Sequence, residues 1–270
     1  MDDAGKHTII PFKRQLQAEV TALTRYKYFM QGLVELDITK ARELLRCYKE
    51  RTGKSLSFTA WLVRCVAVAV SENLEVQAIK KRNKLYIFED VDVSIAIERK
   101  IDGKPFPALH VIRKANEKSL LEIHNEIREL QKPKSKEEMS SDISNKKLKR
   151  LLRLPKFIRK IVFWDRVRRN PYFLKQINGT VSVTAIGMFG KGMGGWGINL
   201  GYHSVNIVTG GITFKPRLFD GKLVNREFMN LSIRIDHTIT DGAPSVRFGR
   251  RLGELIESAF ELKEFCLKKN

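Results

Sequence analysis

The segment from Ser232 to Gly242 carries the side chains with the clearest chemical potential. Its pattern predicts a strand that runs into a tight turn at His237, after which Asp241 and Gly242 open a last helix. A neutral imidazole fixed at a strand end can take a proton near pH 7, so His237 is a candidate general base. The alternative is that Asp241 is only a helix cap, Gly242 only a turn residue and His237 an ordinary histidine. Taken alone, these residues favour the structural alternative.

A second feature is a run of six glycines between Gly187 and Gly197. Residues 192–197 formally match the GxGxxG pattern of dinucleotide-binding proteins, but that pattern must open a helix. Residues 198–207 have no helical periodicity. We therefore expect a flexible loop or a close approach of two backbones rather than a nucleotide site.

The elements that would hold these residues alternate between helical and strand periodicity without a repeat. We expect helices over residues 38–49, 58–70, 119–130 and about 243–263, and strands over residues 90–98, 180–186, 205–212 and 227–235. Residues 91, 93, 95 and 97 alternate strictly and give the clearest strand. The sequence thus predicts a mixed α/β fold.

Four blocks resemble one known family. Residues 236–242 are similar to the DHxxxDG signature of the catalytic domain of 2-oxoacid dehydrogenase dihydrolipoamide acyltransferases, which are relatives of chloramphenicol acetyltransferase. Residues 179–190, 91–97 and 111–123 resemble that family's GTFTI(S/T)NxGxFG block, its strand of the same pattern, and its VIRNADxKSLxEI segment. The four blocks occur in the family's order.

The resemblance implies a chloramphenicol acetyltransferase-like two-layer sandwich, in which a mixed sheet packs against helices, and a homotrimer with active sites between subunits. By position, His237 would be the general base that deprotonates a thiol, and the hydroxyl of Thr184 would stabilise the tetrahedral oxyanion. Asp241 would position the turn and pair with a basic group, for which Arg14 is a candidate. Without the resemblance, Thr184 would be an ordinary strand residue on the face of Ser182.

The resemblance further implies a stand-alone acyltransferase that uses coenzyme A or acyl-coenzyme A as substrate, without a metal. We expect residues 1–270 to form one catalytic domain, without a lipoyl or a peripheral subunit-binding domain. Either acyl groups arrive on a separate carrier, with a lipoyl group supplied in trans, or the enzyme uses acyl-coenzyme A with another acceptor. His110 stands where the family usually has proline, in a strand that would border the substrate channel. The charged C-terminal tail predicts isolated trimers instead of cubic or dodecahedral cores.

The net charge of +20 is concentrated in a basic insertion at about residues 131–178, which holds fifteen Lys and Arg against four acidic residues. Leu148, Leu151 and Leu152 have helical spacing, and Pro155 could begin a helix that groups Phe157, Ile158, Ile161, Val162 and Trp164 on one face. Such a helix could pack on the protein, lie on an anionic membrane, or attract an acidic carrier. No nucleic-acid module accompanies the charge, which disfavours a nucleic-acid partner. A non-catalytic trimer that binds an acidic partner or a membrane surface is the alternative function.

Composition excludes several classes. The chain is 43% hydrophobic and 30% charged, which excludes disorder, and no apolar run approaches the ~20 residues that cross a bilayer. The N-terminal residues have no signal-peptide pattern, so we expect a cytoplasmic protein, for which the basic insertion also allows a peripheral position at the membrane surface. Cys47, Cys65 and Cys266 are far apart in sequence and belong to no metal-binding motif, which predicts reduced thiols.

Overall fold

The computed structural model describes residues 18–19, 21–101, 104–132, 154–187 and 192–267. Its main sheet has the strand order β1-β8-β7-β6-β4-β5. The strands are β1 (Phe29–Asp37), β4 (Val93–Ile101), β5 (Lys104–Ile112), β6 (Val181–Ala185), β7 (Val205–Phe219) and β8 (Lys222–Asp236). The β4–β6 and β6–β7 pairs are parallel, and the other pairs are antiparallel. The predicted mixed sheet is confirmed.

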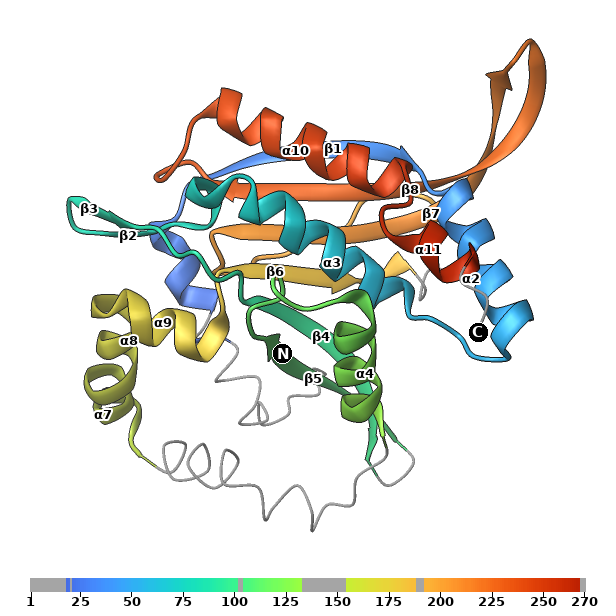
Figure 1. Ribbon diagram of the computed structural model, residues 1–270. Helices are drawn as coiled ribbons and strands as arrows, with labels where there is room; N and C mark the ends of the chain where they lie inside the picture. The colour runs from blue at the N-terminus through green and yellow to red at the C-terminus, as the bar shows by residue number, and fades with distance from the viewer. Residues whose placement is uncertain (1–17, 20, 102–103, 133–153, 188–191, 268–270) are drawn as a thin grey trace, which may run out of the picture.

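A layer of helices covers one face of this sheet (Figure 1). It contains α3 (Phe58–Ser71), α4 (Leu120–Gln131) and α10 (Gly242–Glu257), with α2 (Thr39–Thr52) and α11 (Leu262–Leu267) at its edge. The core between the two layers includes the fully buried Trp61 of α3 and Phe248 of α10. Two local signals set the helix starts: the Ser57 side chain accepts from Ala60 N–H, and Ser119 and Glu122 form a capping box.

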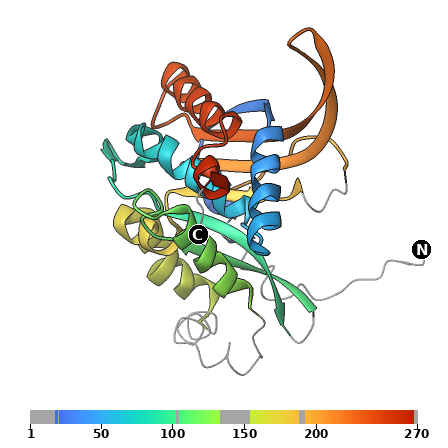
Figure 2. The same cartoon turned by 45° about the vertical axis from the view of Figure 1, so that its right-hand side comes forward.

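Smaller elements lie at one end of the sheet (Figure 1). They are a 3₁₀ turn η1 (Leu23–Tyr26), α7 (Lys156–Arg159), a π-helical turn η3 (Lys160–Trp164), α8 (Asp165–Arg169) and α9 (Pro171–Asn178). A two-stranded ribbon of β2 (Ile79–Lys81) and β3 (Lys84–Tyr86) follows the 3₁₀ turn η2 (Leu74–Gln77) and packs beside α9. At the opposite end, the β7–β8 hairpin projects from the body (Figure 2).

The predicted elements are present, and the main differences concern the last helix and several strands. The expected helix over residues 243–263 is two helices, because Ala259 and Glu261 have positive φ angles that no continuous helix accepts. Strands β7 and β8 are longer than predicted. Strands β1 and β5 were not predicted. The clear strand begins at Val93 rather than at residue 90.

The glycine-rich loop confirms close backbone packing. Residues 192–204 run without regular structure past the β7 bulge at Gly210 and Gly211. A Cβ atom added to Gly210 would lie 2.1 Å from the Gly195 carbonyl oxygen, and one at Gly211 would lie 2.0 Å from that of Met193. Only glycine permits these approaches. No helix follows the GxGxxG residues, so a dinucleotide site is excluded here.

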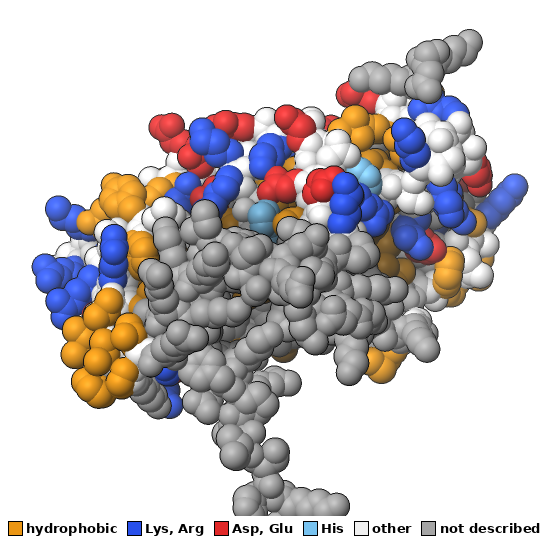
Figure 3. Space-filling model, turned by 90° about the horizontal axis from the view of Figure 1, so that it is seen from below, with side chains coloured by type: hydrophobic (Ala, Val, Ile, Leu, Met, Phe, Trp, Pro, Cys, Tyr) orange, Lys and Arg blue, Asp and Glu red, His pale blue; other side chains and the backbone are white. Residues whose placement is uncertain are grey.

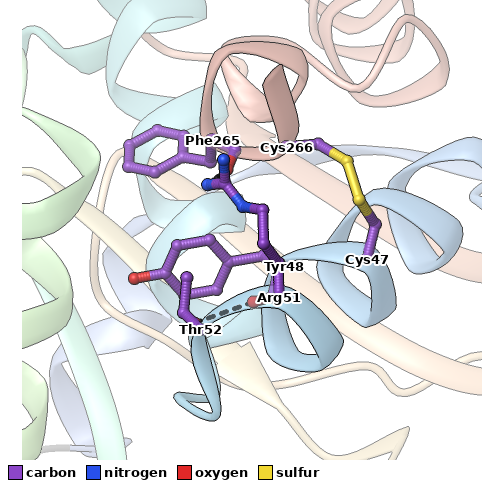
Figure 4. Close-up of a disulfide and its surroundings, with 6 residues drawn as sticks. All are labelled: Cys47, Tyr48, Arg51, Thr52, Phe265 and Cys266. Carbon is purple, nitrogen blue, oxygen red and sulfur yellow. Dashed lines mark hydrogen bonds between the residues drawn. A yellow bond between two sulfur atoms is a disulfide. The ribbon is translucent and has the colours of Figure 1, made fainter. Parts of the chain in front are cut away.

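The prediction of reduced thiols is wrong for two of the three cysteines. Cys47 of α2 and Cys266 of α11 form a disulfide, with their Cα atoms 6.0 Å apart (Figure 4). Beside it, the Tyr48 and Phe265 rings meet edge to face, and Arg51 donates to the Phe265 carbonyl. Sequence spacing failed because the packing of α11 on α2, and not a local motif, brings the two thiols together. Because disulfides persist mainly in oxidising environments, the cysteines no longer support a cytoplasmic location.

Cys65 fits the prediction, since it is a buried free thiol in α3. Among the described residues, no group of three or more His, Cys, Asp or Glu side chains is placed to hold a metal ion. The described helices also include none with the length and apolar character needed to cross a bilayer.

Candidate active site

His237 lies where strand β8 ends, and backbone fixes it from both sides. Its N–H donates to the Tyr28 carbonyl at 2.6 Å, which continues the β1–β8 ladder by one residue. The ring Nδ1 lies 3.0 Å from the Thr240 carbonyl oxygen. A carbonyl can only accept, so we assign the Nδ1–H tautomer, which leaves Nε2 with a free lone pair. The His237 side chain is 51% exposed, so this lone pair is accessible to a substrate.

Asp236 organises the turn below His237. Its Oδ1 accepts from the Thr238 N–H at 3.0 Å and from the Thr238 hydroxyl at 2.8 Å. Its Oδ2 lies 3.0 Å from Lys27 Nζ, in an ion pair that is almost fully buried. Burial lowers the pKa of Lys27, although the nearby Asp236 carboxylate opposes that shift. Asp236 belongs to the same sequence motif as Asp241, although the family resemblance implied a positioning role for Asp241.

Asp241 does not fill that role in the part of the chain that the structure describes. It occupies the N-cap position of α10 without a side-chain cap bond, and its side chain is 91% exposed. Its Oδ1 lies 3.9 Å from His237 Nδ1, which is beyond hydrogen-bond distance. The proposed partner Arg14 lies outside the described residues. In the described part of one chain the turn contacts come from Asp236, and the role of Asp241 stays a prediction.

Thr184 lies on β6, partly buried, on the face of the sheet opposite the helices. Ser182 shares this face, as predicted, and its hydroxyl donates to Asn206 Oδ1 at 2.9 Å. No described group hydrogen-bonds to the Thr184 hydroxyl, so it is available as a donor.

Thr184 and His237 are far apart within one chain. Strand β6 is parallel to β7, and β7 is antiparallel to β8, so the C-terminal ends of β6 and β8 lie at opposite ends of the sheet (Figure 1). Thr184 pairs with Val208, which pairs with Ser232, five residues before His237. At ~3.3 Å per residue the two side chains are about 16 Å apart along the strands. One chain alone does not assemble the base and the oxyanion donor.

Two other histidines have structural environments. His110 Nε2 lies 2.7 Å from Glu126 of α4, which also pairs with Lys118. Burial raises the pKa of Glu126, but the hydrogen bonds from His110 and Lys118 outweigh it and hold that pKa below its usual value. His110 thus ties β5 to the helical layer. His203 is partly buried, with its Nε2 2.8 Å from the Asn178 carbonyl oxygen, and desolvation of the ring lowers its pKa to about 4.

The cavities do not coincide with the candidate residues. A cavity of about 780 Å³ lies between α2, α4 and α11 and is lined by residues that include Arg51, Arg64, Lys118 and Phe265. Neither His237 nor Thr184 lines it.

Comparison with known proteins shows which family this chain resembles. A family model described as 2-oxoacid dehydrogenases acyltransferase (catalytic domain) matches residues 5–148 and 163–263. The dihydrolipoyllysine-residue succinyltransferase component of the 2-oxoglutarate dehydrogenase complex of Staphylococcus saprophyticus is 25% identical over 240 residues, which are 84% of this chain and 46% of that protein. The lipoamide acyltransferase component of the branched-chain alpha-keto acid dehydrogenase complex of Bacillus subtilis is 24% identical over 234 residues, 85% of this chain and 46% of that protein.

Solved structures show the same fold. A probable dihydrolipoamide acetyltransferase from Listeria monocytogenes superimposes with a TM-score of 0.69 at 22% identity, covering 96% of this chain and 97% of that one. The chain spans slightly less than half the length of the two curated relatives. The family model covers most of the described residues, including the β8–α10 turn with His237 and the strand with Thr184. The chain therefore belongs to the family of 2-oxoacid dehydrogenase acyltransferase catalytic domains.

Proposed function

We propose that this chain transfers an acyl group between a thioester and a thiol, with coenzyme A as one of the two thiol carriers. The observation that carries this proposal is the His237 geometry. The Thr240 carbonyl holds the proton on Nδ1, which directs the basic Nε2 outward, where a thiol can reach it. A thiol is mostly protonated at neutral pH, so a base within hydrogen-bond reach raises the fraction of reactive thiolate.

In the proposed reaction His237 Nε2 takes the proton from the attacking thiol, and the sulfur forms a bond to the acyl carbonyl carbon. The carbonyl electrons move to oxygen, and the Thr184 hydroxyl donates to this oxyanion. The tetrahedral intermediate then collapses, the original carbon–sulfur bond breaks, and the departing thiolate recovers the proton from the His237 imidazolium. No net proton or electron is consumed.

We further propose that the active unit is a homotrimer, in which His237 of one subunit meets Thr184 of the next. The distance between the two residues in one chain supports this arrangement, because a single subunit cannot use both. The β7–β8 hairpin offers contact surface, since Phe214, Leu218 and Leu223 are exposed on it. We propose coenzyme A and a lipoyl group supplied in trans as carriers; the single domain over residues 1–270 and the cytoplasmic location stay predictions.

The acyl group is an open part of the proposal, because the related proteins are named for succinyl and for branched-chain complexes. Purified protein is incubated with acetyl-, succinyl- and isobutyryl-coenzyme A, with and without dihydrolipoamide, and coenzyme A release is measured by chromatography. We expect release that requires the dihydrolipoamide acceptor. Turnover of none of these, together with no binding of coenzyme A, contradicts the proposal and supports the non-catalytic binding trimer.

Mixed assemblies test the shared site directly. His237→Ala and Thr184→Ala variants are each expected to lose most activity, about 10²-fold or more. Co-refolding the two in equal amounts places His237 of one variant beside Thr184 of the other at about a quarter of the sites, because subunits of a ring mix at random. We expect about a quarter of the wild-type activity to return. If no activity returned, a site built from two subunits would be contradicted.

A further inference from the structure

The helical segment α7–η3–α8 exposes apolar side chains and buries a charged one. Phe157, Ile161 and Val162 are 66%, 65% and 57% exposed, whereas Arg159 is only 6% exposed. We call Phe157, Lys160, Ile161, Val162, Arg166 and Arg169 the α7–α8 surface. The sequence left open whether the predicted apolar face packs on the protein, lies on an anionic membrane or attracts an acidic carrier. Of the five residues grouped on that face, Phe157, Ile161 and Val162 are exposed, whereas Ile158 and Trp164 are partly buried.

Specific contacts hold the segment in this orientation. Arg159 Nη2 lies 2.5 Å from Glu19 Oε1, and the Trp164 indole N–H donates to Glu19 Oε2 at 2.7 Å. Behind them, Val167 and Leu174 form a small second core with Ile79. These contacts use the inner face of the segment, and they leave Phe157, Ile161 and Val162 directed outward from a well-anchored element.

Positive charge surrounds the exposed apolar side chains. Lys160, Arg166 and Arg169 are exposed on the same segment, and the neighbouring β2–β3 ribbon adds the exposed cations Lys80, Arg82 and Lys84. Asp165, the acidic residue of η3–α8, is already paired with Arg168 and Arg169. Burial and then the nearby cations Arg168, Arg169 and Arg82 lower the pKa of Lys81, which belongs to the ribbon. Figure 3 shows hydrophobic and basic side chains side by side at this end of the molecule.

The apolar part of this surface lies outside the residues that the family model matches. The family model leaves out residues 149–162, which include Phe157, Ile161 and Val162. An assembly contact that is common to the whole family would use residues that the family model includes. A two-fold contact, which pairs this surface with its own copy, would bring two positive surfaces together and cost free energy.

We propose that the α7–α8 surface docks on an anionic lipid bilayer. Phe157, Ile161 and Val162 enter the boundary between headgroups and acyl chains, while Lys160, Arg166 and Arg169 contact the lipid phosphates and carboxylates. A bilayer accepts projecting apolar side chains at any position, whereas a protein partner would need a matching groove for each. Charge complementarity therefore selects an anionic bilayer as the occupant. This inference is independent of the acyl-transfer proposal.

Sedimentation with vesicles tests the docking surface. The full chain is mixed with phosphatidylcholine vesicles that contain about one third phosphatidylserine, and with pure phosphatidylcholine vesicles, at several salt concentrations. We expect binding to the anionic vesicles only, weakening as salt rises. Lys160→Gln, Arg166→Gln and Arg169→Gln together should weaken binding about a hundredfold, at ~1 kcal/mol per cation. Phe157→Gln with Ile161→Gln should weaken it at least tenfold.

Matched variants control for general charge and hydrophobicity. Arg46→Gln, Lys49→Gln and Arg247→Gln remove the same charge from exposed sites on α2 and α10, and Leu121→Gln with Leu267→Gln removes exposed apolar side chains from α4 and α11. Both controls should retain at least half of the parent's vesicle affinity. Absence of vesicle binding at low salt overturns the proposal. So does binding that Phe157→Gln with Ile161→Gln leaves intact, or retention on immobilised polyglutamate without vesicle binding, which would indicate an acidic protein partner.

Discussion

Lys27 and Asp236 form a buried ion pair, with Nζ 3.0 Å from Oδ2, directly before the residue that we propose as the base. The pair joins the segment that leads into β1 to the last residue of β8, so it fixes the start of the His237 turn. Removing one partner of a buried pair leaves the other charge without compensation, which is more destabilising than the loss of a surface pair.

Asp236→Asn should lower the free energy of unfolding by about 3–5 kcal/mol, because Lys27 keeps its charge in a buried position. Urea denaturation measures the change. Glu117→Gln, which removes the exposed partner of Lys114, should cost less than about 1 kcal/mol and serves as the control. An Asp236→Asn cost as small as that of the control would show that the ion pair does not fix the turn.

Thr184→Ala should lower the turnover number about 10²-fold and leave coenzyme A binding nearly unchanged, since an oxyanion contact exists mainly in the transition state. Thr184→Ser keeps the hydroxyl and should recover most of the turnover. Steady-state kinetics and calorimetric binding of coenzyme A separate the two effects. Equal losses of turnover and binding would instead indicate a packing role for Thr184.

His203→Gln should remove an acid sensitivity of the fold. Burial lowers the pKa of His203 to about 4 from an ordinary value of 6.5. Between pH ~6.5 and ~4 the unfolded chain binds this proton and the folded chain does not, so the free energy of unfolding decreases as the pH is lowered through that range. The total decrease is about 3 kcal/mol, and above pH ~6.5 His203 does not change the stability.

Urea denaturation at pH 7, 6 and 5 measures this dependence in the parent and in the His203→Gln variant, whose amide can still donate to the Asn178 carbonyl. The parent should lose more stability than the variant between pH 7 and pH 5. Parallel losses would show that carboxylates, rather than His203, determine the acid sensitivity.

Cys266→Ser should lower the free energy of unfolding by about 2–5 kcal/mol, because the disulfide with Cys47 closes a long loop in the unfolded chain. Cys47→Ser should have the same effect, and the double variant should cost little more than either single one. Thiol titration of the unfolded, non-reduced protein should find only Cys65. Three titrating thiols, or additive losses in the double variant, would argue against the bond.

Light scattering should report three chains of 31.1 kDa, because the proposed site needs residues from two subunits. A stable and active monomer would contradict the shared site.

The sequence predicted those elements whose periodicity is set locally. The helical spacing in α2 and α4 reflects one face packed against the core, which gives a periodic apolar pattern, and α3 is apolar on most sides because most of its residues are buried. Strand β5 was not predicted because Pro105 and Pro107 interrupt its pattern. It is an edge strand, where proline is tolerated. Strand β1, the other edge of the sheet, contains Gly32 and gives a weak signal.

Properties set by distant contacts could not be predicted in the same way. The outward direction of Phe157 depends on the contact of Arg159 with Glu19, 140 residues away, and the Cys47–Cys266 bond spans 219 residues. In the candidate site, the motif identified His237 and Thr184, but the positioning role of Asp236 became visible only with Lys27 beside it. Pairwise relations between distant residues leave no periodic signal in a single sequence.

The opposite directions of β6 and β8 have a genetic consequence. If each active site takes its histidine from one subunit and its threonine from the next, a subunit that lacks both groups spoils the two sites it borders. In a mixture with such a double variant, activity should fall as the square of the wild-type fraction. A variant that lacks only one group should lower activity in simple proportion. An allele that abolishes both groups while preserving assembly would therefore act as a dominant negative.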